Sequence, residues 1–541
     1  MTRMAREKRL VLILSSLMVF GSAYCYDNPS ALKSQLQQRF HDLPKSRYEF
    51  LFSLSYSLYS IPNVALPFFG GILVDKFGVR SMALVLASLL LAGQLVFAFG
   101  CSIKNFDIML IGRVLFGLGG ETMWVAQSTF VTLWFESSEL AFAFGVNTLF
   151  ARMGTVVNDK LSPIIANEYS VTTALWVGAG FCVFSLGCTC ILVLIDRRYD
   201  LHTDATHKET EVSSGVSLRD VFRFSRSFWL IAFKYTVFYA CIGPFNNVAS
   251  SILLERDFFK QPPPLCQRCG VGAYTKYCDA IAPECPPVPP FAWPLPKLSS
   301  NCTITNALDQ LRCSRSPPYI QDEAINCDDL AWRDGPITAQ YCYKKSYATE
   351  LATTAMSITP LMIGFTAPIS GTFVDMVGLR PLLAMVAETV IVLAHCALTW
   401  TDIDVRLVLT CIGLGACFFS STMWPCIPYV VETRFVGTAF GAITAFSNCG
   451  LASVPLLVAA VYNASGKYIP HVEYVFITCA AITWLLGGVL NGVDICRGHV
   501  LNRRVLRPIL DTTASSDMRE RLLDEDDEKD GNHHRLDGKI V

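Results

Sequence analysis

Long apolar stretches divide this chain, and their length constrains the fold more than any other feature of the sequence. An α-helix of about 20 apolar residues crosses the roughly 30 Å hydrocarbon core of a bilayer. Of the side chains, 52% are hydrophobic and only 16% are charged, a balance typical of polytopic membrane proteins and not of soluble enzymes. We therefore expect an all-α membrane protein with twelve transmembrane helices. The expected spans are Leu10 to Tyr26, Arg47 to Val74, Met82 to Cys101, Phe106 to Phe135, Leu140 to Ala166, Val171 to Ile195, Ser227 to Leu254, Tyr347 to Val374, Leu382 to Trp400, Val405 to Val430, Val436 to Tyr462 and His471 to Cys496.

Charge and motifs argue against several other classes of protein. The formal net charge of −1 disfavours a nucleic-acid partner, because phosphate binding needs a concentrated excess of Lys and Arg. The sequence contains no P-loop and no convincing catalytic triad or metal-binding signature. We therefore expect a protein embedded in the lipid bilayer that is not an enzyme and needs neither a cofactor nor a metal ion.

The distribution of Lys and Arg predicts the orientation in the membrane. An even number of spans places both termini on the same side. Basic residues are concentrated in residues 1–9, 76–80 and 197–226 and after residue 496, whereas the short loops of opposite parity hold few. By the positive-inside rule, both termini are cytosolic. A cleaved signal peptide is the alternative for the first stretch, but its removal would leave eleven spans and contradict this charge distribution.

Two polar segments divide the chain into domains. Residues 196–226 contain no apolar stretch and are expected to form a cytosolic linker between two six-helix halves. Residues 255–346 are rich in Pro and Cys and interrupt the second half. The expected domains are the first half (1–195), the linker (196–226), the first helix of the second half (227–254), the Cys-rich insert (255–346), the other five helices (347–496) and a disordered cytosolic tail (497–541).

The two halves repeat each other. The segment from Gly71 to Arg80 recurs from Gly371 to Arg380, each time between the second and third spans of its half. A second repeat relates residues 143–154 to residues 439–450, where Ala-Phe-Gly, Thr, Phe and Gly recur at identical spacing. Parallel repeats of this kind are related by an axis along the membrane normal. A binding site is therefore expected between the halves, near mid-depth.

The first repeat suggests a gate. Gly71 and Gly78 permit a tight turn and a close approach of helices, while Asp75 is suited to cap an adjacent helix N-terminus and Arg80 supplies a counter-charge. Breaking such contacts would open one face of the protein. An ordinary polar turn would explain a single copy, but a second copy at the corresponding position favours a mechanical role. The matching residues of the second half are Asp375 and Arg380.

These segments resemble the signature motifs of the major facilitator superfamily. Gly71 to Arg80 is similar to its motif between spans two and three, and Arg113 to Gly119 is similar to its second motif, in span four. Residues 25–29, 62–64, 68–71, 119–121, 125–127 and 151–154 resemble lysosomal dipeptide uniporters of this superfamily. The resemblance implies the two-half major facilitator fold, a gating or packing role for Arg113, and uniport of dipeptides.

Glu121 and Arg152 are the strongest candidates for a binding site. Each lies near the middle of a span, where an ionisable group is costly and usually faces a cavity. A mutual salt bridge between spans four and five is the simplest structural explanation. Alternatively, Glu121 binds the α-ammonium and Arg152 the α-carboxylate of one zwitterionic substrate. Charge alone leaves amino acids and short peptides open, and the resemblance implies substrate-binding roles for both residues and a dipeptide substrate.

Aromatic and amide side chains in the spans are candidates for the pocket lining, although each one alone is more often a packing residue or an interfacial anchor. Asn448 aligns with Arg152 in the repeat, so the anion-binding group is confined to the first half. Lys234 and His395 are expected near span ends, where snorkelling or an interfacial position explains their charge. The lining candidates are Tyr56, Tyr59, Trp124, Gln127, Asn147, Tyr235, Tyr239, Trp424 and Asn448.

The insert is expected in the lumen or outside the cell. An even number of cysteines in an oxidising compartment indicates a domain stapled by disulfides, whose pairing the sequence does not determine. Zinc binding at Cys266 and Cys269 is the less favoured alternative, because no second matched pair follows. Glycosylation sequons at Asn301 and Asn463 both fall on the predicted lumenal side. The cysteines are Cys266, Cys269, Cys278, Cys285, Cys302, Cys313, Cys327 and Cys342.

Two features concern location and partners. Leu522 and Leu523 are followed by five acidic residues and resemble an acidic dileucine sorting signal, although a solvated disordered tail explains the charge run equally well. The resemblance also implies a heavily glycosylated accessory membrane protein. The family is expected to have a short connection at the position of residues 255–346, so the insert departs from the family pattern. The insert could replace or modify the role of that accessory subunit.

Together these features predict an alternating-access carrier whose two halves rock around a midplane site and export dipeptides from lysosomes. Two alternatives stay open. One is a proton-coupled symporter of another organic anion or amino acid, with Glu121 as the group that exchanges the proton. The other is a nutrient sensor or receptor that has the carrier fold but does not transport.

Overall fold

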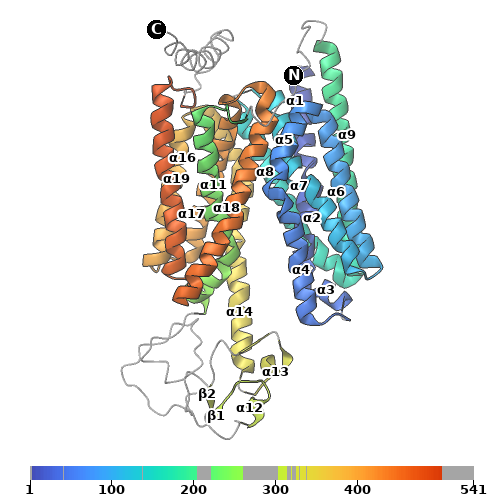
Figure 1. Ribbon diagram of the computed structural model, residues 1–541, viewed down its shortest axis with the longest axis vertical. Helices are drawn as coiled ribbons and strands as arrows, with labels where there is room; N and C mark the ends of the chain where they lie inside the picture. The colour runs from blue at the N-terminus through green and yellow to red at the C-terminus, as the bar shows by residue number, and fades with distance from the viewer. Residues whose placement is uncertain are drawn as a thin grey trace, which may run out of the picture.

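The computed structural model is a bundle of long helices that run along one common axis (Figure 1). It describes residues 3–40, 42–136, 138–203, 221–259, 302–312, 318–319, 325–327, 329–336 and 338–502. Within these residues, 11 helices are long and apolar enough to cross a membrane, or up to 12 if a bent pair between residues 50 and 77 forms one span. The predicted all-α membrane fold is confirmed.

The N-terminal half consists of α1 to α9. Its first expected span is divided into α1 and α2, and its second is bent by 52° just before α5. Val11 and Tyr24 of the first span are both fully buried, so this stretch is part of the bundle. The elements are α1 (Arg3–Leu17), α2 (Phe20–Ala31), α3 (Lys33–Arg39), α4 (Lys45–Ser60), the 3₁₀ turn η1 (Pro62–Val64), α5 (Leu66–Phe77), α6 (Val79–Ser102), α7 (Phe106–Trp134), α8 (Leu140–Glu168) and α9 (Val171–Thr203).

The C-terminal half has the same plan. Its first helix, α11 (Arg226–Leu253), has the expected bounds within one residue and ends in a π-helix, η2 (Leu254–Phe258). Its second span combines α14 with α15 and leads from the insert into the bundle. The other elements are α14 (Ala339–Met356), α15 (Ile358–Val377), α16 (Arg380–Trp400), α17 (Val405–Met423), η7 (Trp424–Tyr429), η8 (Thr433–Phe435), α18 (Val436–Ser465) and α19 (His471–Cys496).

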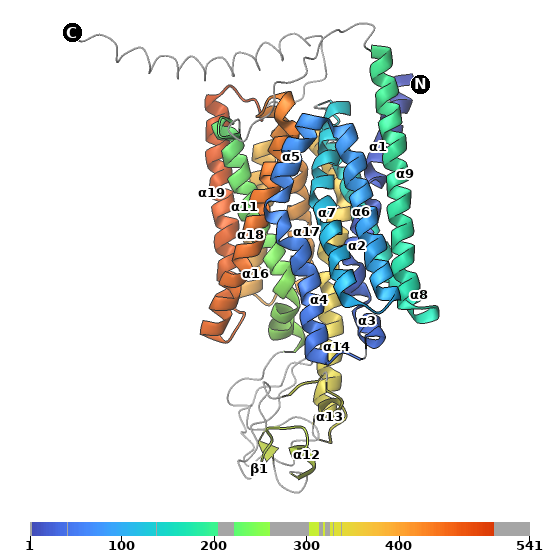
Figure 2. The same cartoon turned by 45° about the vertical axis from the view of Figure 1, so that its right-hand side comes forward.

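The two halves stand side by side and define two ends of the molecule (Figures 1 and 2). We call the end where α1 begins and α19 ends the terminus end, and the opposite end the insert end. At the insert end, the strands β1 (Cys302–Thr303) and β2 (Pro318–Tyr319) pair in parallel beside α12 (Asp309–Arg312) and α13 (Leu330–Arg333). A disulfide between Cys327 and Cys342 joins this small subdomain to α14.

The base of the insert is tied to the C-terminal half through η2. Glu255 accepts hydrogen bonds from the backbone N–H groups of Tyr468 (2.9 Å) and Ile469 (3.2 Å). Arg256 donates to the backbone carbonyls of Thr401 (2.6 Å) and Ile403 (2.9 Å). These contacts link the end of α11 to the loops α16–α17 and α18–α19, so the described part of the insert is anchored to this half.

Two predicted boundaries differ from the structure. Helix α9 continues to Thr203 and so enters the expected linker. The expected tail begins with a folded segment, because Asp494 accepts hydrogen bonds from the N–H groups of Leu501 (2.8 Å) and Asn502 (2.9 Å), and both residues are buried. The dileucine segment, Asn301 and the Cys266–Cys269 pair lie outside the described residues.

Glycine-lined crossings join the halves at two places, α5 against α18 and α8 against α15. A Cβ atom on Gly441 would lie 2.1 Å from the carbonyl oxygen of Pro67, and one on Gly145 would lie 2.3 Å from that of Ala367. Backbones approach this closely only where side chains are absent. The Ala-Phe-Gly repeat of the sequence is therefore the seam between the halves, where the rings of Phe144 and Phe440 meet with centroids 6.1 Å apart.

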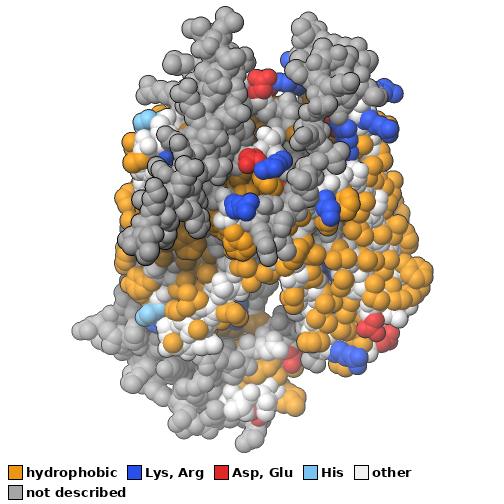
Figure 3. All heavy atoms as spheres, turned by 45° about the horizontal axis from the view of Figure 1, so that its top comes forward, with side chains coloured by type: hydrophobic (Ala, Val, Ile, Leu, Met, Phe, Trp, Pro, Cys, Tyr) orange, Lys and Arg blue, Asp and Glu red, His pale blue; other side chains and the backbone are white. Residues whose placement is uncertain are grey.

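The outer surface matches a lipid environment. Figure 3 shows hydrophobic side chains over the flanks of the bundle, whereas Lys and Arg gather toward the terminus end. Large apolar side chains such as Phe184, Val386 and Leu485 are exposed on the bundle. The thirteen cysteines outside the insert are free thiols, as expected for residues of membrane helices.

Candidate functional site

Glu121 projects from α7 toward α4. It is half-buried, and the hydroxyl of Tyr59 donates a hydrogen bond to its Oε1 at 3.4 Å. Glycines on α7 create the space for this contact, because a Cβ on Gly120 would lie 2.5 Å from the Tyr59 hydroxyl. The Tyr59 ring also packs edge-on against Tyr26 of α2, with centroids 4.9 Å apart. One oxygen of Glu121 thus has an aromatic hydroxyl partner.

Arg152 lies on α8 at the interface between the halves. Its side chain is exposed, and its Cβ lies 3.1 Å from the position that a Cβ of Gly364, on α15, would occupy. Within the described residues, no ion pair joins Arg152 to Glu121 at 4 Å or less. The mutual salt bridge is therefore not formed in this conformation.

Asp27 is a site residue that the sequence reasoning did not single out. It lies half-buried on α2, where Thr155 of α8 hydrogen-bonds to its carboxylate, and its charged neighbours include Arg152 and Asp159. The available signal was an acidic residue at the end of the first apolar stretch. Asp27 is thus a second carboxylate that interacts electrostatically with Arg152.

The aromatic and amide candidates have different environments. Gln127 donates to the carbonyl of Ser15 at 2.7 Å, and Asn147 accepts from the hydroxyl of Ser16 at 2.7 Å. Both amides are buried and hold α1 against α7 and α8, so the structure places them in helix packing. Tyr56 is half-buried beside Tyr26, and Trp124 packs against the apolar core of the bundle.

The C-terminal half contributes an aromatic cluster. Tyr235 stacks on Tyr239 with centroids 5.5 Å apart and meets Trp424 edge-on at 5.4 Å. The buried Tyr235 hydroxyl has no hydrogen-bond partner among the described residues. Trp424 Nε1 donates to Ser128 of α7 at 3.1 Å, and Asn448 donates to the carbonyl of Asn63 at 2.6 Å. Trp424 and Asn448 thus connect the halves directly.

The repeated Asp residues cap helices of the opposite half. Asp75, at the end of α5, accepts hydrogen bonds from the N–H groups of Gly437 (2.9 Å) and Thr438 (2.6 Å) at the start of α18. Asp375, at the end of α15, accepts from the N–H groups of Ala141 (3.2 Å) and Phe142 (2.8 Å) at the start of α8. Each carboxylate lies at the positive end of a helix dipole. The terminus end is closed by these reciprocal caps.

The other residues of the repeat support the caps. A Cβ on Gly71 would lie 2.3 Å from the carbonyl oxygen of Gly437, and Gly78 has φ +83°, a conformation that favours glycine. Arg80 pairs with Asp196 of α9. Arg380 pairs with Asp375 at 3.4 Å. The two Arg residues therefore differ in partner although they align in sequence.

The buried charges of the C-terminal half correct the sequence analysis. Lys234 and His395 were expected to snorkel near span ends, but both are fully buried. Lys234 pairs with Glu388 at 2.9 Å, and His395 Nδ1 contacts Glu473 at 2.9 Å. The expectation failed because the carboxylate partners lie on helices that are distant in sequence.

Comparisons with known proteins agree with this architecture. Residues 7–256 match the Major Facilitator Superfamily. The chain is 26% identical to the lysosomal dipeptide transporter MFSD1 of Homo sapiens over 508 residues, which cover 92% of this chain and 88% of that protein. It is also 26% identical to MFSD1 of Danio rerio, over 87% of this chain and 84% of that protein.

The match to the Major Facilitator Superfamily covers the N-terminal half and the first helix of the C-terminal half. Solved structures of transporters have the same fold at low sequence identity. The proton:xylose symporter XylE superposes with a TM-score of 0.57 at 11% identity, over 92% of this chain and 96% of that chain. The human organic anion transporter MFSD10 superposes with a TM-score of 0.54 at 12% identity, over 89% of this chain and 99% of that chain. The chain is thus a membrane transporter with the two-half major facilitator fold.

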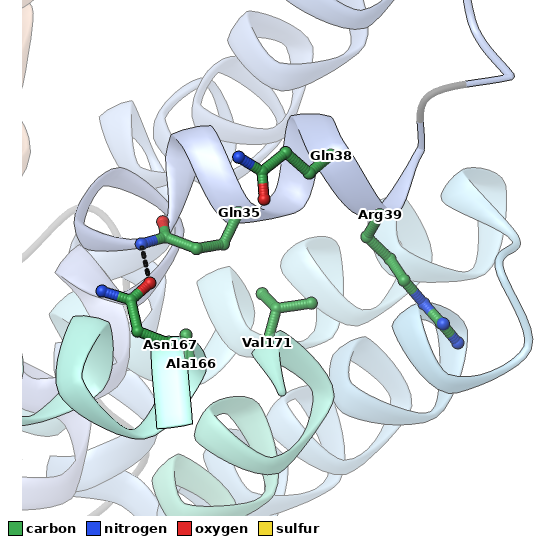
Figure 4. Close-up of a pocket in the computed structure, with 6 residues that line it drawn as sticks. All are labelled: Gln35, Gln38, Arg39, Ala166, Asn167 and Val171. Atoms are coloured by element: carbon green, nitrogen blue, oxygen red, sulfur yellow. Dashed lines mark hydrogen bonds between the residues drawn. The ribbon is translucent and has the colours of Figure 1, made fainter. Parts of the chain in front are cut away.

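A cavity of about 370 Å³ lies at the insert end of this major facilitator bundle, away from the charged residues of the interface (Figure 4). Gln35, Gln38 and Arg39 of α3 line one side, and Asn167 and Val171 line the other. Gln35 donates to Asn167 at 3.1 Å. Neither Glu121 nor Arg152 lines this cavity, so it is distinct from the candidate substrate site.

The reciprocal caps predict a specific response to mutation. Asp75→Asn should increase backbone hydrogen exchange in the first turn of α18 about fivefold, because losing a charged cap costs about 1 kcal/mol. Asp375→Asn should do the same in the first turn of α8. Hydrogen-exchange mass spectrometry measures both segments in one experiment, and each variant is the control for the other. Equal effects of both variants on both helices would contradict the assignment.

Proposed function

We propose that this protein is an alternating-access transporter that exports dipeptides from the lysosomal lumen to the cytosol by uniport. Glu121 and Arg152 support the proposal most directly. They carry opposite charges on neighbouring helices, do not pair with each other, and Arg152 lies against the other half. A dipeptide has an ammonium at one end and a carboxylate at the other. The names of the MFSD1 relatives supply the dipeptide and the lysosome.

The geometry suggests how the site binds both ends of a peptide. The planar guanidinium of Arg152 offers parallel donors to a carboxylate, which favours bidentate binding. Glu121 accepts from an ammonium while Tyr59 holds its Oε1 in place. Because every dipeptide has these two termini, recognition of the termini allows many side chains. The aromatic cluster at Tyr235 and Trp424 would then form an apolar wall toward the terminus end.

Transport requires the caps at the terminus end to open. In the present conformation Asp75 and Asp375 hold each half to a helix of the other half. Bound substrate gives the halves shared contacts through Arg152 and α15, so rocking of the halves can carry it from one end to the other. The caps would re-form after release, because each depends only on groups within the chain.

We further propose that the terminus end faces the cytosol. Basic side chains gather there (Figure 3). Asn463 is exposed and lies near the C-terminal end of α18, at the insert end. If Asn463 is lumenal, it is accessible to glycosylation. Asn463→Gln should therefore remove one glycan and increase electrophoretic mobility, and glycosidase treatment of the parent should do the same. An Asn463→Gln protein that migrates like the parent before and after glycosidase treatment would argue against this orientation.

The insert suggests a protective role. We propose that it shields the lumenal face from proteases and that it replaces or modifies the role of an accessory membrane glycoprotein. The described part is held by the Cys327–Cys342 disulfide and by η2. Deletion of residues 262–340 should shorten the lifetime of the protein in lysosomes. An unchanged half-life would count against this role.

Two assays test the proposed function. Thermal unfolding of the purified protein is measured with dipeptides, tripeptides, free amino acids and sugars, since a ligand that binds the folded state raises its stability. Uptake into liposomes is then measured with and without an imposed pH gradient. We expect stabilisation by dipeptides and uptake independent of the gradient. Uptake that requires the gradient would indicate symport, and stabilisation without uptake would indicate a sensor.

A further inference from the structure

Pro29 lies inside α2 and leaves one backbone carbonyl without its helical partner. Proline has no N–H group, so residue 29 cannot donate to the carbonyl of Cys25, four residues earlier. Inside a membrane an unpaired carbonyl is costly, because no water is available to replace the lost donor. Cys25 is completely buried, so its carbonyl needs a donor from another helix.

Arg113 of α7 supplies that donor. Its Nη1 donates to the carbonyl of Cys25 at 3.3 Å, and its Nη2 donates to that of Tyr26 at 3.2 Å. The side chain is 1% exposed and has no acidic partner within 4 Å among the described residues. Aromatic rings surround the guanidinium, with Tyr56 at 5.1 Å and Phe116 at 5.6 Å from Cζ. The cation is thus stabilised by backbone dipoles and π-faces.

We propose that Arg113 is a positioning residue that replaces the hydrogen bond lost at Pro29 and thereby fixes the substrate-facing part of α2. The two residues that follow Cys25 are those that reach the site. Tyr26 packs against Tyr59, the partner of Glu121, and Asp27 lies near Arg152. Arg113 therefore acts on both Glu121 and Arg152 through α2. Its effect on substrate rests on the proposed function.

A double-mutant cycle isolates this role. Arg113→Met removes the donors while keeping an unbranched apolar side chain, and Pro29→Ala restores an N–H that can donate to Cys25. Arg113→Met should weaken binding of alanyl-alanine about tenfold or more, with a smaller change in the maximal transport rate, because hydrogen bonds from charged groups are strong. Pro29→Ala alone should change binding less than about threefold. The double variant should recover most of the affinity lost in Arg113→Met.

The unfolding midpoint of the same four proteins gives a second readout that needs no substrate. The destabilisation by Arg113→Met should be smaller in the Pro29→Ala background. Additive effects in both readouts would overturn the proposal. A lower midpoint with unchanged alanyl-alanine affinity would also overturn it, because Arg113 would then only stabilise the fold. If the parent protein does not bind dipeptides, the proposed function fails, while the coupling of the midpoints still decides whether Arg113 replaces the bond lost at Pro29.

Discussion

Glu121→Gln and Arg152→Ala should each abolish the thermal stabilisation of the protein by alanyl-alanine. Removing one partner of a charged contact weakens binding by about 2 to 5 kcal/mol, a factor of roughly 30 or more. A ligand at 100 times its Kd stabilises the folded state by about 2.7 kcal/mol, and a hundredfold weaker affinity reduces this to about 0.4 kcal/mol. Differential scanning fluorimetry at a fixed peptide concentration measures the difference.

Matched controls separate loss of the site from loss of charge. Arg39→Ala removes a guanidinium from α3, where Arg39 donates to the carbonyl of Ser102 at 3.0 Å, and Glu168→Gln removes an exposed carboxylate at the end of α8. Both controls should respond to alanyl-alanine like the parent. N-acetylated alanyl-alanine and alanyl-alanine amide each lack one charged terminus, so neither should stabilise the parent. If both site variants respond like the parent, the binding of peptide termini by Glu121 and Arg152 is refuted.

Asp27→Asn adds a discriminating case to this experiment. Asp27 lies near Arg152 but does not belong to the pair that binds the two termini in our proposal. Loss of its charge should leave the affinity for alanyl-alanine within about fivefold of the parent value, since an exposed or half-buried charged neighbour contributes about 1 kcal/mol or less. A complete loss would show that Asp27, and not only Glu121, binds the ammonium.

The sequence predicted the spans and the two-half repeat because both are periodic or repeated features, but only the structure shows that the Ala-Phe-Gly repeat forms the seam between the halves. Long apolar stretches mark helices that lipid surrounds, and the Gly71 and Ala-Phe-Gly repeats mark contacts that occur once in each half. The reciprocal nature of the caps was not predictable. The sequence indicates that Asp75 caps a helix, but only the packing of α5 on α18 shows that the helix belongs to the other half.

Single polar residues were harder to interpret because sequence position does not reveal the face of a helix. Gln127 and Asn147 occur in the same helices as Glu121 and Arg152, yet they bind the backbone and hydroxyl groups of α1. Asp27 was missed for a related reason. The sequence does not show whether a carboxylate near the end of an apolar stretch lies at the membrane interface or inside the bundle. Contacts with residues that are distant in the sequence decide these cases.

The buried Lys234–Glu388 pair gives the largest expected change in stability. Lys234→Met should destabilise the protein by about 3 to 5 kcal/mol, because it leaves a carboxylate unpaired in the membrane interior. The exposed fractions of the two side chains are 0% and 1%, so water cannot replace the lost ammonium. Gly487 leaves room for this ion pair, since a Cβ on Gly487 would lie 2.7 Å from Lys234 Nζ and 2.9 Å from Glu388 Oε2. The unfolding midpoint of the detergent-solubilised protein measures the change.

The double variant Lys234→Met with Glu388→Leu distinguishes pairing from a general requirement for polar groups. Replacing both members of a buried pair by apolar residues of similar volume is often neutral or stabilising, so this protein should unfold close to the parent midpoint. Alanyl-alanine should still stabilise it, because the pair joins α11 to α16 and has no described contact with Glu121 or Arg152. If the double variant is as unstable as Lys234→Met, the pair is not the source of the loss. If it is stable but unresponsive to peptide, the charges of α11 and α16 belong to the transport mechanism.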